Sequence, residues 1–272
     1  MSTLLSAILT FTTPRRGSLP AALGRAIHAE VLRQIDQRDS QMARQLHAWN
    51  GPVPLTCSGL NNARRAGAEL PVGPGERYEV HVTGLMEAVS HVLHSFLIQE
   101  PESVWTIHNH PFVLESVTCD PAHHPWAGIT DYQQLAADHL LATGNPSNRV
   151  TLRFDSPTSF KSNEMQIPVP MPDLVFGSLV DRWNQFSPIL LSDEMREFSR
   201  TCVAVSRYNL RSVPMPHKPG AMRIGGVGEV TYTALDGDRY WHGAMQMLAD
   251  FAVFSGVGVQ TTNGMGQARK IG

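Results

Sequence analysis

The order of the predicted strands and helices is the feature that most constrains the fold of this chain, because the same order occurs twice. In the first half, the spacing of apolar residues predicts strand, helix, strand, strand, helix, strand. A turn-rich segment at residues 144–148 (GNPSN) follows, and the series begins again with a strand at residues 149–155. The repeat lies in the order of elements and not in residue identity. We therefore expect two domains, residues 1–147 and residues 148–272.

Each half supplies the elements of one small α+β domain. In the first half we predict strands at residues 3–12, 53–58, 77–83, 104–107 and 112–118, and helices at residues 19–35, 40–49 and 85–98. In the second half we predict strands at residues 149–155, 201–207, 223–233 and 265–271, and helices at residues 173–186 and 238–254. This order is that of the ferredoxin-like fold, in which helices cover one face of an antiparallel sheet. The expected fold class is α+β, with two tandem ferredoxin-like domains.

The composition excludes several classes of protein. Of the 272 residues, 42% are hydrophobic and 17% are charged, which excludes a disordered or fibrous chain. The formal net charge of −2 argues against a strong global attraction to nucleic acid. No apolar run approaches the roughly 18 residues of a membrane span. Three scattered cysteines fit a reducing compartment better than a disulfide framework. We expect a cytoplasmic protein with no membrane partner.

Four glycines near the end of the sequence form the most specific motif. Gly256 and Gly258 are followed, after five residues, by Gly264 and Gly266. The motif is not the dinucleotide fingerprint G-x-G-x-x-G, because Thr261 stands where the third glycine would be. Glycines at this density allow positive φ angles and close backbone approach, and their N–H groups could hold phosphate oxygens. The alternative interpretation is a tight connection between a helix and a strand.

Together with four other segments, this motif resembles a known family. The loop is similar to the G-h-G, five residues, G-h-G signature (h, hydrophobic) of the RAMP superfamily of CRISPR systems. Residues 152–161 (LRFDSPTSFK) are similar to the segment that opens the second domain of that superfamily's repeat-RNA endoribonucleases. Further similar stretches lie at residues 42–58, 168–188 and 223–230. The resemblance implies tandem ferredoxin-like domains and metal-independent cleavage of CRISPR precursor transcripts within their repeats. The products would be guide RNAs with 2′,3′-cyclic phosphate and 5′-hydroxyl ends.

The resemblance also implies which residues carry catalysis. His47 matches the family's Leu-His position, and His28 on the first predicted helix is the second candidate. Histidine suits proton transfer near neutral pH, although the sequence does not show which of the two is the acid and which the base. The first helix has no tyrosine, and Val53 stands where fuller family members have a lysine. Another cation, such as Arg33 or Arg44, could therefore assist.

The RNA-binding candidates are cationic side chains in the second half and the glycine loop. Residues 198–228 contain five cations and no acid, a pattern that fits either a phosphate-facing stripe or a solvated sheet face. The candidates are Arg153, Lys161, Arg200, Arg207, Arg211, Arg223, Arg269 and Lys270, together with Gly256, Gly258, Gly264 and Gly266. The expected partner is CRISPR repeat RNA and not DNA, and an association with other CRISPR effector subunits is left open.

Three rival functions remain open on the sequence alone. A non-catalytic RNA-binding subunit of the same superfamily would keep the glycine loop and the cationic stripe. A metal-dependent hydrolase could use His108, His110, His123 and His124 with Cys57 and Cys119, but their spacing lacks the paired ligands of a zinc site. A ferredoxin-like regulator that binds a small metabolite explains the fold order but not the paired glycines. We expect no metal and no cofactor.

Overall fold

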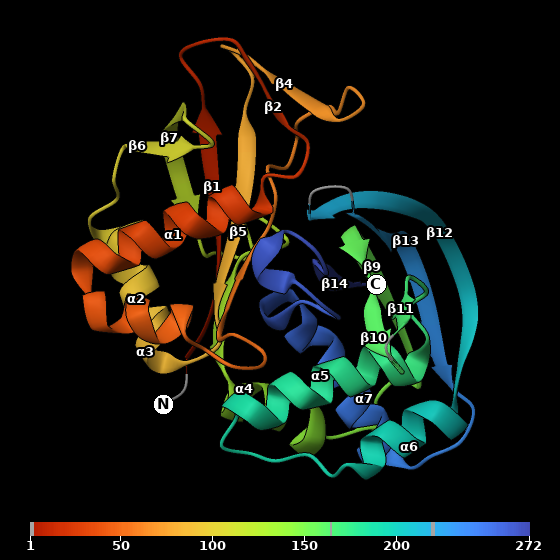
Figure 1. The fold of residues 1–272 in the computed structure, drawn as a ribbon. Helices are drawn as coiled ribbons and strands as arrows, with labels where there is room; N and C mark the ends of the chain where they lie inside the picture. The colour runs from red at the N-terminus through yellow and green to blue at the C-terminus, as the bar shows by residue number, and fades with distance from the viewer. Residues whose placement is uncertain (1–2, 164, 219–220) are drawn as a thin grey trace. The chain divides into compact units, whose positions relative to one another are not determined.

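The computed structural model describes residues 3–163, 165–218 and 221–272, which form two compact units (Figure 1). Unit 1 comprises Thr3–Ile129 and the short segment Thr262–Gly264. Unit 2 comprises the described residues of Thr130–Thr261 and Met265–Gly272. The division after Ile129 differs from the expected junction at residues 147 and 148. The turn-rich segment lies inside unit 2, because the helices just before it, α4 (Tyr132–Ala136) and the π-helix η2 (Ala137–Leu141), pack against α7 (Arg239–Ser255).

Unit 1 is built on an antiparallel sheet with the strand order β3-β5-β1-β7-β6. The strands are β1 (Thr3–Thr12), β3 (Leu55–Cys57), β5 (Tyr78–Gly84), β6 (Val104–Ile107) and β7 (His110–Thr118). The helices are α1 (Gly24–Arg38), α2 (Ser40–His47) and α3 (Glu87–His94), which continues as the π-helix η1 (Ser95–Gln99). Ile27, Val31 and Ile35 of α1 are fully buried in one core with the strands. The order of β1, α1, β3, β5, α3 and β7 confirms the expected ferredoxin-like arrangement.

The start of the first helix differs from the prediction. Residues 17–20 form the strand β2 (Gly17–Pro20), which pairs with β4 (Glu69–Val72) within the connector that follows β3. Helix α1 therefore begins at Gly24 and not at residue 19. The cause is a backbone partner that is distant in sequence, which the local spacing of apolar residues does not encode.

Unit 2 has the same layout around the sheet order β12-β13-β9-β14. The strands are β9 (Arg149–Thr158), β12 (Val203–Lys218), β13 (Ala221–Ala234) and β14 (Ala268–Ile271). The strand β8 (Gly128–Asp131), at the division of the chain, pairs with β1 as the sixth strand of the other sheet. The longer helices α5 (Pro172–Phe186) and α7 contact the sheet and each other, and α6 (Glu194–Thr201) packs on α5. A small hairpin, β10 (Phe160–Ser162) with β11 (Met165–Ile167), and the 3₁₀ turn η3 (Thr261–Asn263) complete the fold. Phe176 of α5 meets Tyr232 of β13 at 5.5 Å between ring centroids in this core.

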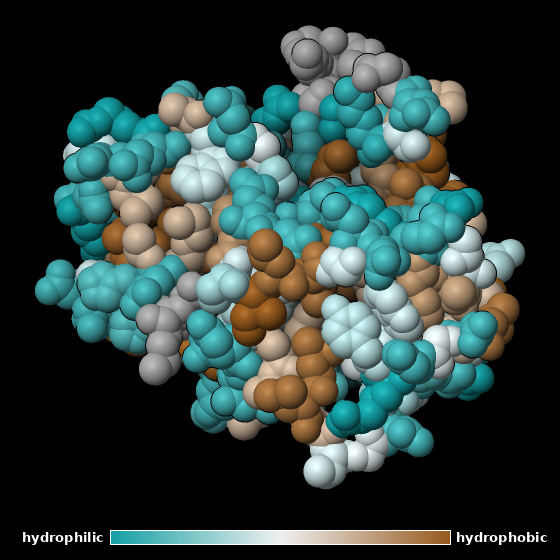
Figure 2. Space-filling model, turned by 90° about the horizontal axis from the view of Figure 1, so that it is seen from below, coloured by the Kyte–Doolittle hydropathy of each residue, from teal (hydrophilic) through white to brown (hydrophobic). Residues whose placement is uncertain are grey.

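On the face drawn in Figure 2, hydrophobic areas lie among hydrophilic ones. Exposed apolar side chains of unit 2 include Leu141, Leu190 and Leu235. Within the described parts of the chain, no helix combines the length and apolar character needed to cross a membrane.

Candidate catalytic site

The two histidines indicated by the sequence lie on neighbouring helices of unit 1. Helix α1 buries the face that carries Ile27, so the next residue, His28, lies at the edge of that face and is half-buried. Helix α2 begins where the Asp39 carboxylate accepts the N–H of Met42 at 2.9 Å, and its last residue is His47, which is exposed. The turn between α1 and α2 brings the two imidazoles near enough for the charge of His47 to act on His28.

The surroundings of His28 keep its imidazole uncharged. Burial, and after it the nearby charge of His47, lower the pKa of His28 from 6.5 to about 4. The Nδ1 atom of His28 lies 4.0 Å from the thiol sulfur of Cys57, a buried residue of β3 whose pKa burial raises. At neutral pH the site therefore contains one neutral, partly buried imidazole beside one solvent-exposed imidazole. Such a pair can take a proton from one atom and deliver a proton to another.

The glycine motif forms a tightly folded loop in which all four glycines have positive φ angles. The angles are 62° at Gly256, 79° at Gly258, 86° at Gly264 and 70° at Gly266, which explains why glycine stands at each position. Their N–H groups donate, in the same order, to Ala252 O, Ser178 Oγ, Cys57 O and Pro157 O. These four N–H groups are thus engaged within the chain and do not form the phosphate cradle that we expected. The glycines remain RNA-binding candidates through the shape that they give to the loop.

A buried arginine that the sequence motifs do not indicate holds this loop. The Arg182 guanidinium of α5 donates to Gly258 O at 2.7 Å and to Ser178 Oγ at 2.6 Å, and Ser178 in turn receives the Gly258 N–H. Burial lowers the pKa of Arg182 to about 10, so this side chain remains charged at neutral pH. Its one sequence signal is its place in the segment 168–188 that resembles the family.

Some of the predicted RNA-binding cations lie on one face of the unit 2 sheet, the face opposite the buried strand residues. Val150, Leu152 and Phe154 of β9 are buried, and the alternation places Arg153 on the other face. Cross-strand pairing puts Arg269 and Glu229 beside Arg153, and Asn209 of β12 beside Glu229. Arg207 and Arg211 share the face of Asn209 and are exposed.

The other predicted cations lie elsewhere or have acidic partners. Arg200 on α6 bonds the Glu197 carboxylate at 2.6 Å, and Lys270 bonds Asp250 of α7 at 3.0 Å. Arg153 itself contacts Asp155 at 2.7 Å. Lys161 lies on the strand β10, and Arg223 lies near the start of β13. The sheet face therefore unites Arg153, Arg207, Arg211 and Arg269, but not the whole predicted set.

Three of the four histidines of the metal hypothesis have other partners, and all four lie in unit 1. His110 shares a hydrogen bond with Thr13 at 2.7 Å, His123 contacts Asp120 at 3.3 Å, and His124 contacts Glu79 at 3.6 Å. In the described ranges, no group of three or more His, Cys, Asp or Glu side chains is placed to share a metal ion. The geometry gives the metal-dependent alternative no site among these residues.

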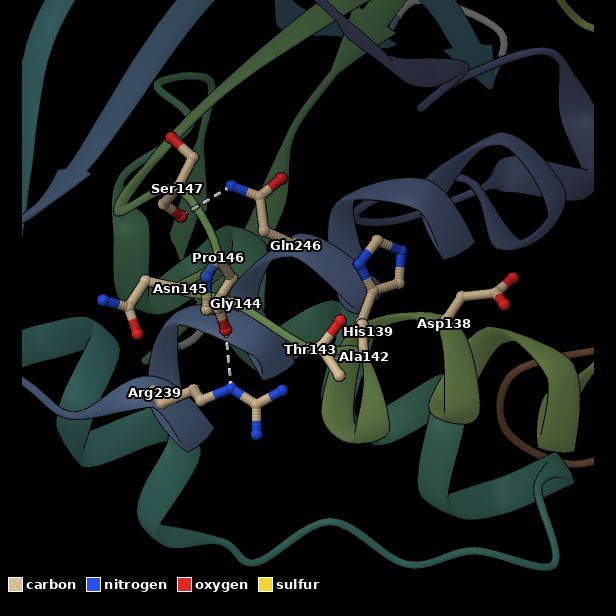
Figure 3. Close-up of a pocket in the computed structure, with 10 residues that line it drawn as sticks. All are labelled: Asp138, His139, Ala142, Thr143, Gly144, Asn145, Pro146, Ser147, Arg239 and Gln246. Atoms are coloured by element: carbon tan, nitrogen blue, oxygen red, sulfur yellow. Dashed lines mark hydrogen bonds between the residues drawn. The ribbon is translucent and has the colours of Figure 1, made fainter.

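Unit 2 also contains a polar cavity of about 250 Å³ that the sequence did not indicate (Figure 3). Arg239, at the start of α7, donates from Nε to Gly144 O at 2.8 Å, and Gln246 donates to Ser147 O at 2.8 Å. His139 lines the cavity and bonds the Asp250 carboxylate at 2.8 Å. None of the site residues predicted from the sequence lines it. The turn-rich segment 144–148, which suggested a domain junction, instead contributes to one wall of this cavity.

Comparisons with known proteins agree with this architecture. The fold, two units with the ferredoxin-like strand order, is shared with solved Cas6 and RAMP structures. The family model described as CRISPR-associated endoribonuclease Cas6 matches residues 152–268. A CRISPR-associated endoribonuclease Cas6 from Streptococcus thermophilus is 28% identical over 144 residues, which are 50% of this chain and 57% of that protein. The chain is therefore similar to the Cas6 family, over residues 152–268 for the family model and over half of its length for this relative.

Solved structures extend the similarity over nearly the whole chain. A Cas6 product complex is 25% identical, with a TM-score of 0.78 over 99% of this chain and 100% of that one. A structure of Thermus thermophilus Cas6, 23% identical, has a TM-score of 0.74 over 100% of this chain and 99% of that one. A RAMP protein described as binding different RNA substrates shares the fold at 11% identity, with a TM-score of 0.60 over 100% of both chains.

Proposed function

We propose that this protein is a metal-independent endoribonuclease that cleaves CRISPR precursor transcripts within their repeats. The proposal rests on one observation above all: a neutral, partly buried His28 lies beside an exposed His47 in unit 1. The match of residues 152–268 to the Cas6 family model and the similarity to a Cas6 product complex support the choice of RNA as substrate. The three cysteines are free thiols, which is consistent with our placing the activity in the cytoplasm.

The geometry suggests a division of labour between the two imidazoles. His28 Nδ1 faces the Cys57 sulfur, which leaves Nε2 to accept the proton of the RNA 2′-hydroxyl. The 2′-oxygen then attacks the adjacent phosphorus, and the bond from phosphorus to the 5′-oxygen breaks. His47, in contact with solvent, delivers a proton to the departing 5′-oxygen. The products are a 2′,3′-cyclic phosphate and a 5′-hydroxyl.

The cationic face of the unit 2 sheet is our candidate for holding the RNA backbone. Arg207 and Arg211 are exposed there, and Arg153 and Arg269 lie on the same face. Contacts to phosphate would set affinity and make it sensitive to salt, whereas the shape of a repeat hairpin would set recognition. Arg33, which the sequence offered as an assisting cation, is bound to Glu30 at 2.7 Å, so we do not assign it a role in catalysis.

Cleavage of end-labelled repeat RNA in EDTA tests the proposal. We expect the unaltered protein to cut within the repeat, and His28→Ala and His47→Ala each to slow cleavage by roughly a hundredfold or more, the range for loss of a general acid or base. His123→Ala is the matched control, because His123 is an exposed histidine of the same unit that bonds Asp120. Loss of cleavage in EDTA, restored by added divalent ions, would overturn the metal-independent mechanism.

The second candidate function is a non-catalytic RNA-binding subunit. Val53 at the place of a lysine, and a helix α1 without tyrosine, favour it. In the same assay, tight binding of repeat RNA without any cut by the unaltered protein would decide for this candidate. Association with other CRISPR effector subunits would then be the next measurement, by co-purification with the bound RNA.

A further inference from the structure

The short segment Thr262–Gly264 of the glycine loop packs against the first residue of α1. A side-chain Cβ on Gly24 would lie 2.1 Å from the Asn263 carbonyl oxygen and 2.6 Å from the Gly264 nitrogen. Both are backbone atoms, so no rotation of a side chain can make room. Gly24 is thus a glycine because the backbone of this segment touches the helix there.

This contact lies on the part of α1 that carries His28. Residues four apart lie on the same helix face, and a helical side chain leans back over the turn that precedes it. The imidazole of His28 therefore extends over the turn that begins at Gly24, which is the turn that Asn263 and Gly264 touch.

A second contact leads from the same segment to the same imidazole. The Gly264 N–H donates to the carbonyl oxygen of Cys57 at 3.0 Å, and the Cys57 sulfur lies 4.0 Å from His28 Nδ1. Gly264 has a φ of +86°, and a Cβ on it would lie 3.0 Å from the Gly59 nitrogen and 3.2 Å from the Gly24 Cα. The segment is therefore fitted between the start of α1 and the end of β3.

We propose that Thr262–Gly264 is a positioning element for His28, acting through Gly24 on one side and Cys57 on the other. This inference rests on the proposed function, because it assigns Gly264 to the alignment of a catalytic imidazole and not to the holding of RNA phosphates. Backbone contacts on a helix and a strand hold a side chain more firmly than a free loop would, and misplacement of a reacting group by about 1 Å can cost a hundredfold in rate.

The test compares Gly24→Ala with Gly59→Ala. Gly59 also adjoins Gly264, but a Cβ at Gly59 would meet nothing within 4 Å, so this substitution is a matched control. We expect Gly24→Ala to lower kcat for repeat-RNA cleavage by at least tenfold while the Kd for the RNA stays within twofold. We expect Gly59→Ala to cleave like the unaltered protein.

A readout independent of cleavage is the titration of His28 by NMR, with its signal identified by its absence from the spectrum of His28→Gln. Burial holds the pKa of His28 near 4 in the intact site, so displacement of the ring in Gly24→Ala should move the titration upward toward 6.5. A merely structural role for Gly24 would lower stability and leave both kcat and this titration in the folded protein unchanged.

The outcomes separate this inference from the proposed function. If the unaltered protein binds repeat RNA without cutting it, the proposed function has failed, whereas normal cleavage by His28→Ala overturns the role of His28 and with it the positioning role. If His28→Ala is inactive but folded Gly24→Ala matches Gly59→Ala in kcat and in titration, only the positioning role is overturned. Should Gly24→Ala not fold, Cys57→Ala and Cys57→Ser decide. We expect a loss of cleavage in Cys57→Ala that Cys57→Ser restores through its hydroxyl, and normal cleavage by both would overturn the inference.

Discussion

At the residue scale, the position of His28 on its helix determines both the burial and the protonation state of its imidazole. His28 follows a fully buried isoleucine on α1, so the helix that builds the core of unit 1 also draws this ring partly out of water. Desolvation favours the neutral ring, which is the form that a base needs and the form that a folded protein can bury at low cost. The function that we propose and the stability of unit 1 thus depend on the same protonation state.

This dependence predicts a loss of stability in acid. The pKa of His28 is about 4 in the folded chain and near 6.5 when unfolded, so between these values the unfolded state binds more protons. Stability therefore falls as the pH drops from 6.5 to 4, by an upper limit of about 3 kcal/mol from this residue, and is unaffected above that window. Urea unfolding at pH 7 and pH 4 should show a smaller loss for His28→Gln than for the unaltered protein. Equal losses would contradict the prediction.

At the scale of elements, the glycine loop shows what the sequence can and cannot predict. The four paired glycines correctly indicate unusual backbone angles, because positive φ is a local property of each residue. The acceptors of their N–H groups are not predictable, since Ser178, Pro157 and Cys57 lie far away in the sequence. The prediction of the strand Thr3–Thr12 is confirmed, because its apolar pattern is local. The prediction of a helix from residue 19 is wrong at its start, because a distant partner makes residues 17–20 the strand β2. Local patterns specify an element, and distant partners decide its ends and its contacts.

The candidate site divides in the same way. A histidine at the edge of a helix face and another in the last turn of a short helix are predictable from apolar spacing and from the cap at Asp39. Their mutual electrostatic effect and the thiol beside His28 require the fold. The role of Arg182 under the loop is equally unpredictable from the sequence, because most arginines lie on the surface and the acceptor that this one binds is known only from the fold.

The close approach of backbone atoms at Gly258 predicts that an added methyl group lowers the free energy of unfolding more there than at Gly67, a glycine outside the loop. Gly67 has a φ of +65° with open space around it, so Gly67→Ala should cost about 1–2 kcal/mol from backbone strain alone. Gly258 has a φ of +79°, and its Cβ would lie 2.3 Å from Ser159 O, so Gly258→Ala should cost distinctly more. Chemical unfolding of both variants measures the difference. Similar midpoints for the two would contradict the prediction and show that the loop backbone can shift to accommodate the methyl group.

At the scale of the whole molecule, charge is distributed locally and not globally. The formal net charge is −2, yet Arg153, Arg207, Arg211 and Arg269 share one face of the unit 2 sheet. A local set of cations allows a nearly neutral protein to bind RNA. The affinity then falls with salt, more steeply the more phosphates these side chains neutralise.

Replacement of two of these cations should make the affinity for RNA less sensitive to salt. We expect the double variant Arg207→Gln, Arg211→Gln to reduce the slope of log K against log salt for repeat RNA by about 0.7–0.9 for each phosphate that is no longer neutralised. Arg77→Gln serves as the control, because Arg77 is an exposed arginine of unit 1 that bonds Glu115. Filter binding between low and high salt gives both slopes. An unchanged slope in the double variant would assign the RNA to another surface.

The membership of Thr262–Gly264 in unit 1 has a consequence for how the chain is made. During synthesis the strands and helices of Thr3–Ile129 leave the ribosome first, but the segment that packs on Gly24 and bonds Cys57 follows only after the elements of unit 2 up to α7. The surroundings of His28 are therefore completed late in translation. A nascent chain can fold its first sheet early and still lack an aligned imidazole, so competence to cut RNA would arise only when both units have emerged.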